Sequence, residues 1–372
     1  MNVVRFVPGS LSGALARART LLVTLTVVAG ALGHLAAADL PSEIRLGSGG
    51  LATIDRPYGT ALLGWVGEHK LLEAEFAKDP VKISWQVIKG AGPGVNEAFA
   101  NHAVDFALYG DFSAIIGRAA GIETTILLDA GRGSASYLTV PTGSTARSIS
   151  DLVGKRIGIH RGRPFELAFA ELLAGAHLTY ADFRIFNLTP QDGLAALTTG
   201  SIDALYGTDG PLAEIKGSGR SIWSTIDADP HTSFTAEIFG ASDFVKRYPE
   251  ATQRVVNVLV KAASEISVEA NREAYLDFFA RAGSSADVVH RDWSGIALIE
   301  RNNPLIDPFL REHYRRAAVF AKEHNLIRNE VPDLDGWFDA RFLIQALTIL
   351  KLEQHWTPIA ADGANFRHRL NP

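Results

Sequence analysis

The sequence predicts a two-lobed α/β protein, in which each lobe is a mostly parallel sheet flanked by helices and further C-terminal helices pack on the first lobe. Three observations predict this class. A short pattern occurs twice, as AVDFALYGD at Ala103–Asp111 and as SIDALYGTD at Ser201–Asp209. Strand-like and helix-like segments alternate around both copies, which is typical of parallel sheets covered by helices. The 372 residues also exceed what one hydrophobic core usually supports.

The N-terminal segment is typical of a secretory signal. Three arginines without any acidic residue precede the apolar run Leu21–Leu32, and three alanines ending at Ala38 stand before Asp39. We therefore expect residues 1–38 to be a signal peptide and the remainder to be exported to the periplasm. A membrane anchor is the alternative, but the apolar run is shorter than the roughly 20 residues that a bilayer span needs.

Composition limits the kinds of partner. The chain has no cysteine, which excludes disulfides, thiol nucleophiles and thiolate metal sites. Without the three signal arginines, 33 basic residues face 41 acidic ones, a net charge near −8. Nucleic acids and anionic membranes need basic surfaces, so we expect neither as a partner. An anionic ligand would have to be attracted by local groups.

Residues 39–141 are expected to form the first part of the first lobe. In order, the predicted elements are a strand at 44–47, a helix at 58–76, a strand at 83–88, a helix at 95–101, the first copy of the repeat as a strand, a helix at 112–121, and strands at 125–128 and 137–140. The turn Pro141–Ser144 follows, and the first crossing between lobes is predicted there.

Residues 142–236 are expected to form the second lobe, and residues 237–372 the mainly helical remainder of the first. The predicted elements are a helical turn at 148–152, a strand at 156–160, a helix at 165–174, a strand at 183–188, a helix at 193–199, the second copy of the repeat as a strand, a helix at 210–217, and strands at 221–224 and 234–239. Beyond Tyr248 the apolar spacing is helical, with separate helices at 311–323 and 341–352.

The two copies of the repeat place acidic turns where a ligand cleft is expected. Ligands of parallel sheets bind beyond the carboxyl ends of the strands, and two facing lobes would turn that edge into a cleft. Gly110-Asp111 and Asp209-Gly210 both end a strand and begin a helix. Each aspartate could contact an ammonium or hydroxyl group of a ligand. The alternative is capping, in which the carboxylate accepts hydrogen bonds from the first amides of the helix.

Arg163 is a candidate anion-binding residue. It stands directly before Pro164 at the start of a predicted helix, where a cation meets the positive end of the helix dipole. An anion bound there would remove the conflict, and the first amides of the helix would add donors. The alternative is that Arg163 extends into solvent or pairs with Glu166.

Aromatic and hydroxyl side chains near the same turns could complete a pocket for a small organic molecule, although any of the aromatic ones could equally belong to the core. The full set of predicted ligand-binding residues is Tyr58, Tyr109, Gly110, Asp111, Ser134, Ser136, Tyr137, Arg163, Pro164, Phe165 and Asp209.

Signals for catalysis are missing from the sequence. It contains no Gly-x-Ser-x-Gly elbow, no phosphate loop, no dinucleotide fingerprint and no His-Glu-x-x-His motif. The eleven histidines lack the spacing that would put two on one helical face. We therefore predict no catalytic residue, no metal site and no cofactor.

Four stretches resemble a known family: Gly90–Ala98, Val104–Asp111, Ser150–Gly158 and Asp209–Leu212. The third is similar to a Ser-x-x-Asp-Leu-x-Gly-Lys entry to the second lobe. On these motifs the chain resembles the periplasmic solute-binding proteins of the nitrate, sulfonate and taurine type, the receptor components of ABC importers. The resemblance implies a type II periplasmic binding protein fold, a monomer, and a permease in the inner membrane as partner.

The same resemblance implies a function. We expect the protein to capture a small organic anion or zwitterion, such as an aliphatic sulfonate or taurine, for import. One alternative ligand is a pyrimidine-type thiamine precursor, and another role is that of a ligand sensor for a membrane receptor. An enzyme on the same scaffold, such as a precursor-forming synthase, is disfavoured because the chain lacks cysteine.

Overall fold

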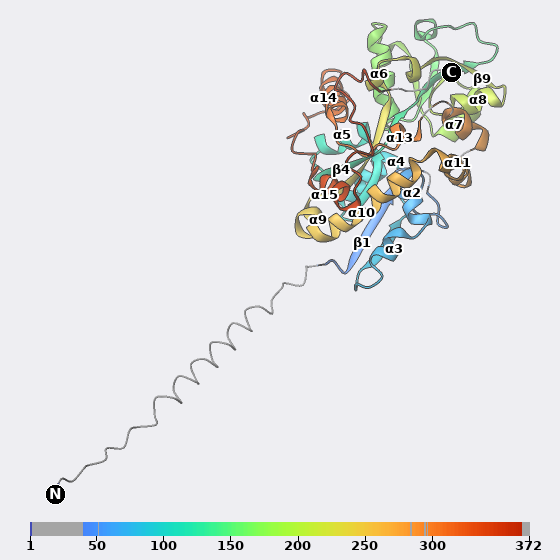
Figure 1. The fold of residues 1–372 in the computed structure, drawn as a ribbon. Coiled ribbons are helices and arrows are strands. Elements are labelled where there is room, and N and C mark those ends of the chain that lie inside the picture. Colours follow the sequence, from blue (N-terminus) through green and yellow to red (C-terminus); the bar gives the residue numbers. More distant parts are fainter. Residues whose placement is uncertain (2–39, 51, 283–284, 294, 296, 367–372) are drawn as a thin grey trace. The chain divides into compact units, whose positions relative to one another are not determined.

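The computed structural model describes residue 1 and residues 40–366, except 51, 283, 284, 294 and 296. The predicted signal peptide, residues 1–38, lies outside the described residues apart from Met1. The chain divides into two units, Met1–Leu40 and Pro41–Pro372, and everything below concerns the second (Figure 1). No helix within the described ranges is both long enough and apolar enough to cross a membrane.

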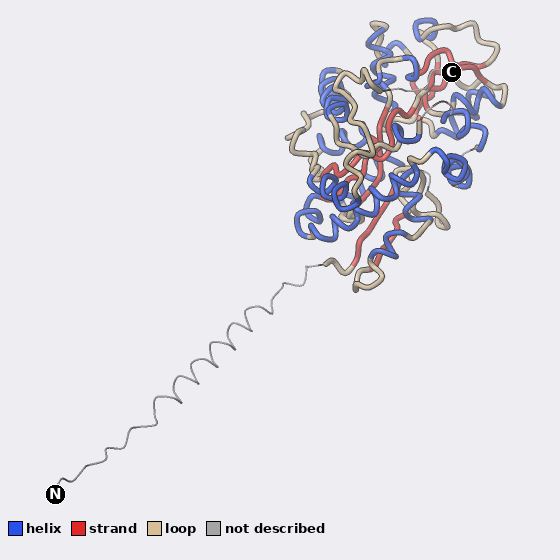
Figure 2. The backbone as a smooth tube through the Cα atoms, in the orientation of Figure 1, coloured by secondary structure: helices blue, strands red, loops and turns tan. Residues whose placement is uncertain are grey.

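Two five-stranded sheets organise the described residues, as predicted (Figure 2). The first sheet has the order β2-β1-β3-β10-β4 and the second the order β7-β6-β8-β5-β9. The strands are β1 (Glu43–Ser48), β2 (Lys82–Gln86), β3 (Phe106–Gly110), β4 (Thr124–Ser134), β5 (Tyr137–Pro141), β6 (Arg156–Ile159), β7 (Arg184–Asn187), β8 (Ala204–Gly207), β9 (Gly219–Ser224) and β10 (Phe234–Ala241). In each sheet the fourth strand in this order, β10 or β5, runs antiparallel to both neighbours, so the sheets are mixed but mostly parallel.

Helices cover both sheets. They are α2 (Ala61–Glu68), α3 (Leu71–Glu75), α4 (Ala91–Ala100), α5 (Asp111–Ala119), α6 (Phe165–Gly175), α7 (Pro190–Thr198), α8 (Gly210–Ile215), α9 (Ser242–Arg247), α10 (Pro249–Ile266), α11 (Arg272–Arg281), α12 (Ala286–Trp293), α13 (Leu298–Arg301), α14 (Pro308–Glu323) and α15 (Arg341–Leu350). Short 3-10 turns lie at 149–152, 180–182, 225–227, 230–232 and 269–271. The helix predicted at 58–76 is two helices, because Lys70 adopts a left-handed conformation between them.

The repeat found in the sequence marks equivalent strands. Its copies form β3 and β8, each the third strand of its sheet. The aspartate before each strand is held in the same way: Arg45 donates to Asp105 from its backbone amide at 2.7 Å and from Nε at 3.0 Å. Arg156 donates to Asp203 from the same two groups at 2.9 and 3.0 Å. The two lobes are therefore built on one plan.

The first crossing between the sheets lies earlier than the sequence predicted. Strand β4 stays paired with β10 as far as Ser134, and β5 begins in the second sheet at Tyr137. Only two residues connect them, too few to contain a recognisable turn signal. The turn Pro141–Ser144 instead follows β5 inside the second lobe. The chain returns between β9 and β10 through the two 3-10 turns at 225–227 and 230–232.

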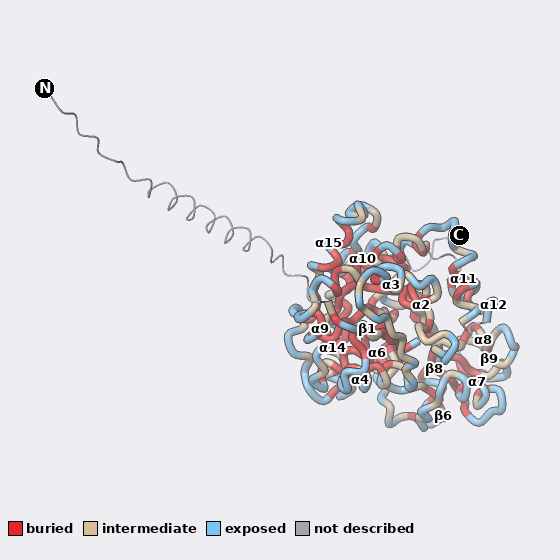
Figure 3. The backbone as a smooth tube through the Cα atoms, turned by 90° about the horizontal axis from the view of Figure 1, so that it is seen from below, coloured by how far each residue is buried: buried red, intermediate tan, exposed pale blue. Residues whose placement is uncertain are grey.

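The core of the first lobe includes the C-terminal helices. Helix α10 buries an apolar face that contains Val255, Val256, Leu259 and Val260, and it packs against α2 and α15. Buried residues lie on the strands and on the inner faces of the helices (Figure 3). One C-terminal helix reaches further than predicted, because α12 also contacts α8 of the second lobe.

Candidate functional site

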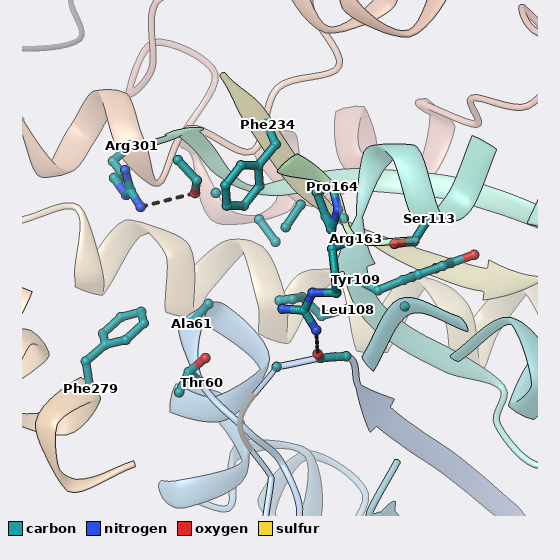
Figure 4. A pocket seen from close by; sticks show the side chains of 18 of the residues that line it. Thr60, Ala61, Leu108, Tyr109, Ser113, Arg163, Pro164, Phe234, Phe279 and Arg301 are labelled. Carbon is teal, nitrogen blue, oxygen red and sulfur yellow. Dashed lines mark hydrogen bonds between the residues drawn. The ribbon is translucent and has the colours of Figure 1, made fainter. Parts of the chain in front are cut away.

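A cavity of about 200 Å³ lies between the two lobes (Figure 4). It opens at the carboxyl ends of β3 and β4, beside the starts of α2, α5 and α6, where the sequence predicted a cleft. It is lined by Gly49, Gly50, Thr60, Ala61, Gly92, Leu108, Tyr109, Gly110, Ser113, Ala130, Gly131, Ser134, Arg163, Pro164, Phe234, Ala236, Tyr275, Phe279, Trp293, Arg301 and Asn302.

The lobes touch at one side of this cavity. The Ser113 hydroxyl in α5 donates to the Gly162 carbonyl of the second lobe at 2.7 Å. Gly110, the last residue of β3, lies against the ring of Pro164. These contacts join the two lobes directly.

Arg163 is the cation of the second lobe in this cavity. Its Nη1 donates to the Gly49 carbonyl across the cleft at 3.4 Å, a long contact. Its Nε is buried and has no hydrogen-bond partner among the described residues. Burial lowers the pKa of Arg163, and the negative charge of Asp209 acts in the opposite direction. The residue as a whole is only partly buried and lines the cavity.

A second arginine, Arg301 at the end of α13, reaches the cavity from the first lobe. It donates from Nη1 to the Gly133 carbonyl at 3.1 Å and from Nη2 to the Ser134 hydroxyl at 3.2 Å. Its guanidinium carbon lies 4.3 Å from the centre of the Trp293 ring. In Figure 4 Arg301 and Arg163 approach the cavity from different sides, with Phe234 between them. No motif in the sequence distinguishes Arg301 from the other arginines of the C-terminal helices.

Aromatic side chains from α11 and α12 form one wall. The ring centre of Phe279 lies 5.2 Å from Tyr275 and 5.3 Å from Trp293, and Tyr275 meets Trp293 edge to face at 5.4 Å. Tyr275 and Trp293 are almost fully buried, whereas Phe279 and Phe234 keep part of their surface exposed. The sequence analysis did not single out any of these four as ligand contacts, because aromatic residues in predicted helices and strands are also typical of an ordinary core.

Five of the predicted ligand-binding residues line the cavity: Tyr109, Gly110, Ser134, Arg163 and Pro164. They come from β3, the end of β4 and the turn before α6. For Arg163 the structure shows neither of the alternatives, because the guanidinium is directed at Gly49. Glu166 is instead bound by Arg161, whose Nε lies 2.7 Å away.

Asp111 lies outside the lining, deep in the first lobe. Its carboxylate accepts hydrogen bonds from the amides of Phe112 at 2.6 Å and Thr235 at 3.0 Å, and it lies 2.7 Å from Nε2 of His313. These contacts use both oxygens within the lobe, and one of them satisfies an amide at the helix start. This is the structural role that the capping alternative described.

The other five predicted residues lie behind or beside the cavity. Ser136 is buried with its hydroxyl 2.9 Å from that of Tyr206, Tyr137 packs over Gly210, and Phe165 belongs to the second core. Tyr58 packs over Gly67, with its ring edge against Trp85. Asp209 is not in the lining, but its charge acts on Arg163. Their proposed contacts with ligand remain predictions.

The described residues contain no cluster of three or more His, Cys, Asp or Glu side chains that could hold a metal ion. The fold and the site together define a class: two similar α/β lobes with a small arginine-lined cavity between them are a type II periplasmic binding protein. The chain belongs to the NMT1/THI5-like family, whose sequence profile matches residues 81–270.

Solved structures place this chain near sulfonate-binding proteins. It is 34% identical to the periplasmic sulfonate-binding protein SsuA from Methylobacillus flagellatus KT, covering 87% of this chain and 99% of that one, with a TM-score of 0.74. The alkanesulfonate-binding protein SsuA from Xanthomonas axonopodis pv. citri, solved with bound MOPS, is 22% identical, covers 82% of this chain and all of that one, and shares the fold with a TM-score of 0.67. The predicted fold class and family are thereby confirmed.

A curated relative whose name also refers to sulfonates matches this chain over a shorter alignment. A protein of Escherichia coli (strain K12), provisionally named as binding aliphatic sulfonates, is 28% identical over 173 residues, which is 46% of this chain and 50% of that protein. The chain spans about half the length, or less, of the curated relatives it matches.

Proposed function

We propose that the protein is the substrate-binding component of an ABC importer and that it captures a small organic sulfonate in the periplasm. The observation that carries the proposal is Arg163, a partly buried arginine that lines the cavity and whose Nε has no hydrogen-bond partner among the described residues. A sulfonate is a permanent anion with three acceptor oxygens, and a planar guanidinium binds such groups with charge-assisted hydrogen bonds. The names of the relatives support the same ligand class.

Backbone groups support an anion at the same end of the cavity. Helix α2 begins at Ala61, and both Thr60 and Ala61 line the cavity. The first amides of a helix have no partner within it and carry the positive end of the dipole. A sulfonate between Arg163 and the start of α2 would therefore contact both lobes.

Contacts to both lobes provide the mechanism. A ligand that interacts with both lobes favours the closed state over the open one, because only the closed state offers both sets of contacts. The Ser113–Gly162 hydrogen bond and the Gly110–Pro164 contact belong to that state. We propose that an inner-membrane permease recognises the closed form and that no bond of the ligand is made or broken.

The alternative ligand, a pyrimidine-type thiamine precursor, would need contacts such as those of stacking tyrosines and of the two aspartates, Asp111 and Asp209. The carboxylate of Asp111 is hydrogen-bonded to groups of its own lobe, and Asp209 lies outside the lining of the cavity. A neutral pyrimidine would also bring no negative charge to Arg163, so the sulfonate is the better ligand for this cavity.

Isothermal titration of the purified protein with ethanesulfonate and taurine tests the proposal, using Arg163→Ala and Arg163→Lys. A hydrogen bond to a charged group contributes about 1.5–3 kcal/mol. We therefore expect Arg163→Ala to weaken binding by roughly ten- to a hundredfold, with partial recovery in Arg163→Lys. Arg161→Ala is the matched control, because Arg161 is two residues away, half exposed and outside the lining. Unchanged affinity in Arg163→Ala would refute the sulfonate site and favour the pyrimidine ligand.

A further inference from the structure

The cavity has two chemically different ends. One end contains Arg163 and Ser113, whose hydroxyl is bonded to the neighbouring Gly162. The other end is mainly aromatic and contains Phe234, Phe279, Tyr275 and Trp293, together with Arg301, whose guanidinium lies over Trp293. Figure 4 shows the Phe234 ring and the Arg163 guanidinium both extending into the space, with Phe279 at its border. An anionic group at the first end would direct the rest of the ligand toward the second.

The aromatic end is held rigidly. Trp293 is covered on one face by Arg301, which is itself fixed by the Gly133 carbonyl and the Ser134 hydroxyl. Phe279 packs against Tyr275 at an interplanar angle of 76° and against Trp293 at 53°. Tyr275 and Trp293 are therefore a support, and Phe279 is the ring that keeps surface for a ligand.

Phe234 approaches from the strand that returns from the second lobe. It is the first residue of β10, and its ring packs edge to face against Phe165 at 6.3 Å. Like Phe279 it is only partly buried. The two phenylalanines thus border the cavity from different elements and leave apolar ring surface available between them.

The size of the cavity suits a ligand with one ring. An apolar cavity of about 150 Å³ holds a benzene molecule, whereas pockets for drug-sized ligands reach about 300–1,000 Å³. The present cavity has about 200 Å³. This volume fits a six-membered ring with an anionic group.

We propose that the ligand is a monocyclic aryl sulfonate and that Phe279 and Phe234 select for its ring. The proposal rests on the proposed sulfonate site at Arg163. Aromatic rings attract one another through their quadrupoles beyond what the buried area provides, and each favourable pair adds about 0.5–1.5 kcal/mol, a factor of about 2 to 12 in affinity. A saturated ring of the same size fills the space but lacks this attraction.

Isothermal titration with three probes distinguishes the effect of an aromatic ring from the effect of ligand size. The probes are benzenesulfonate, cyclohexanesulfonate and methanesulfonate. We expect benzenesulfonate to bind the purified protein about tenfold more tightly than cyclohexanesulfonate, and more than a hundredfold more tightly than methanesulfonate, which leaves the aromatic end unfilled. Phe279→Leu keeps an apolar side chain but removes the ring. This variant is expected to lower the affinity for benzenesulfonate about fivefold and to leave the affinity for cyclohexanesulfonate nearly unchanged.

Two further variants keep the test decisive. Phe234→Leu should reproduce the effect from the other side of the cavity if Phe279→Leu does not fold. Phe320→Leu is the control, because Phe320 is also partly buried but stacks on His324 in α14, outside the lining. Equal affinities for benzenesulfonate and cyclohexanesulfonate would overturn the ring proposal and leave the sulfonate function standing. Failure of all three probes to bind would overturn the proposed function itself.

Discussion

Gly110 of the first lobe and Pro164 of the second lie so close that a Cβ atom added to Gly110 would be 2.1 Å from Cγ of Pro164. The same Cβ would lie 3.2 Å from the Thr235 carbonyl. Gly110 has a φ of −85°, which any residue adopts, so its backbone does not require glycine. The glycine is required by the approach of the other lobe.

Gly110→Ala should therefore keep the lobes apart. We expect the variant to bind a sulfonate at least tenfold more weakly, because its methyl group clashes with the Pro164 ring when the two lobes are in contact, whereas the approach to the Thr235 carbonyl inside the first lobe is far less severe. Small-angle scattering with saturating ligand should show an expanded particle. Gly131→Ala is the control, since Gly131 lines the same cavity and its added Cβ meets no atom within 4 Å. Equal affinity in the two variants would contradict this role.

Asp203 should stabilise the second lobe in a pH-dependent manner. The hydrogen bonds from Arg156 are the main cause that lowers its pKa to about 2. An acid with a lowered pKa in the folded state stabilises the fold above its unfolded value, and the contribution is lost as the pH falls toward the folded value. The Tm difference between wild type and Asp203→Asn should thus be present at pH 6 and shrink between about pH 4 and pH 2. Asp335→Asn, at an exposed carboxylate, should show no such trend.

Glu171 in α6 should have the opposite pH dependence. Burial raises its pKa to about 7, and the nearby charges are those of His313, Asp229 and Asp111. A carboxyl with a raised pKa is buried most easily when protonated, so its ionisation destabilises the fold as the pH rises from about 4.5 to 7. Glu171→Gln should therefore raise the Tm relative to wild type at pH 8 but not at pH 4. The exposed Glu323→Gln serves as control, and equal shifts in both variants would contradict this assignment.

Arg291 in α12 should slow the release of ligand. It forms an ion pair with Glu214 in α8, which joins the C-terminal helices to the second lobe. A half-exposed ion pair contributes about 0–1 kcal/mol, so Arg291→Ala should leave the Tm nearly unchanged. The dissociation rate measured by stopped flow should rise a few-fold and lose part of its salt dependence. Arg281→Ala removes a similar pair, with Glu68, that stays within the first lobe, and it should not change the rate.

The sequence predicted most of the fold because local patterns specify it. The repeated Asp-to-Tyr-Gly phrase identified β3 and β8, and alternation of strands and helices identified the two sheets. The first crossing was misplaced because two residues between long paired strands carry no turn signal. Arg163 was found because a cation at a helix start conflicts with local electrostatics, which sequence alone reveals.

The remainder of the site depends on distant contacts. Asp111 and His313 are 202 residues apart, so no local pattern shows that this carboxylate has a partner inside its lobe. Phe279 and Trp293 have helical spacing, which indicates an apolar face but not that this face meets the cleft. Tyr137 and Phe165 stand at the predicted turns, yet their side chains pack into the core.

The matching arginine–aspartate clamps, Arg45 with Asp105 and Arg156 with Asp203, each fasten the second strand of a sheet, β1 or β6, to the third, β3 or β8, and neither connects one sheet to the other. The chain passes between the sheets only through residues 135–136 and 225–233 in the described part, so a rotation of one half against the other would bend the backbone there. If ligand binding changes that rotation, a pair of fluorophores attached one to each half would report occupancy, and the protein would serve as a biosensor.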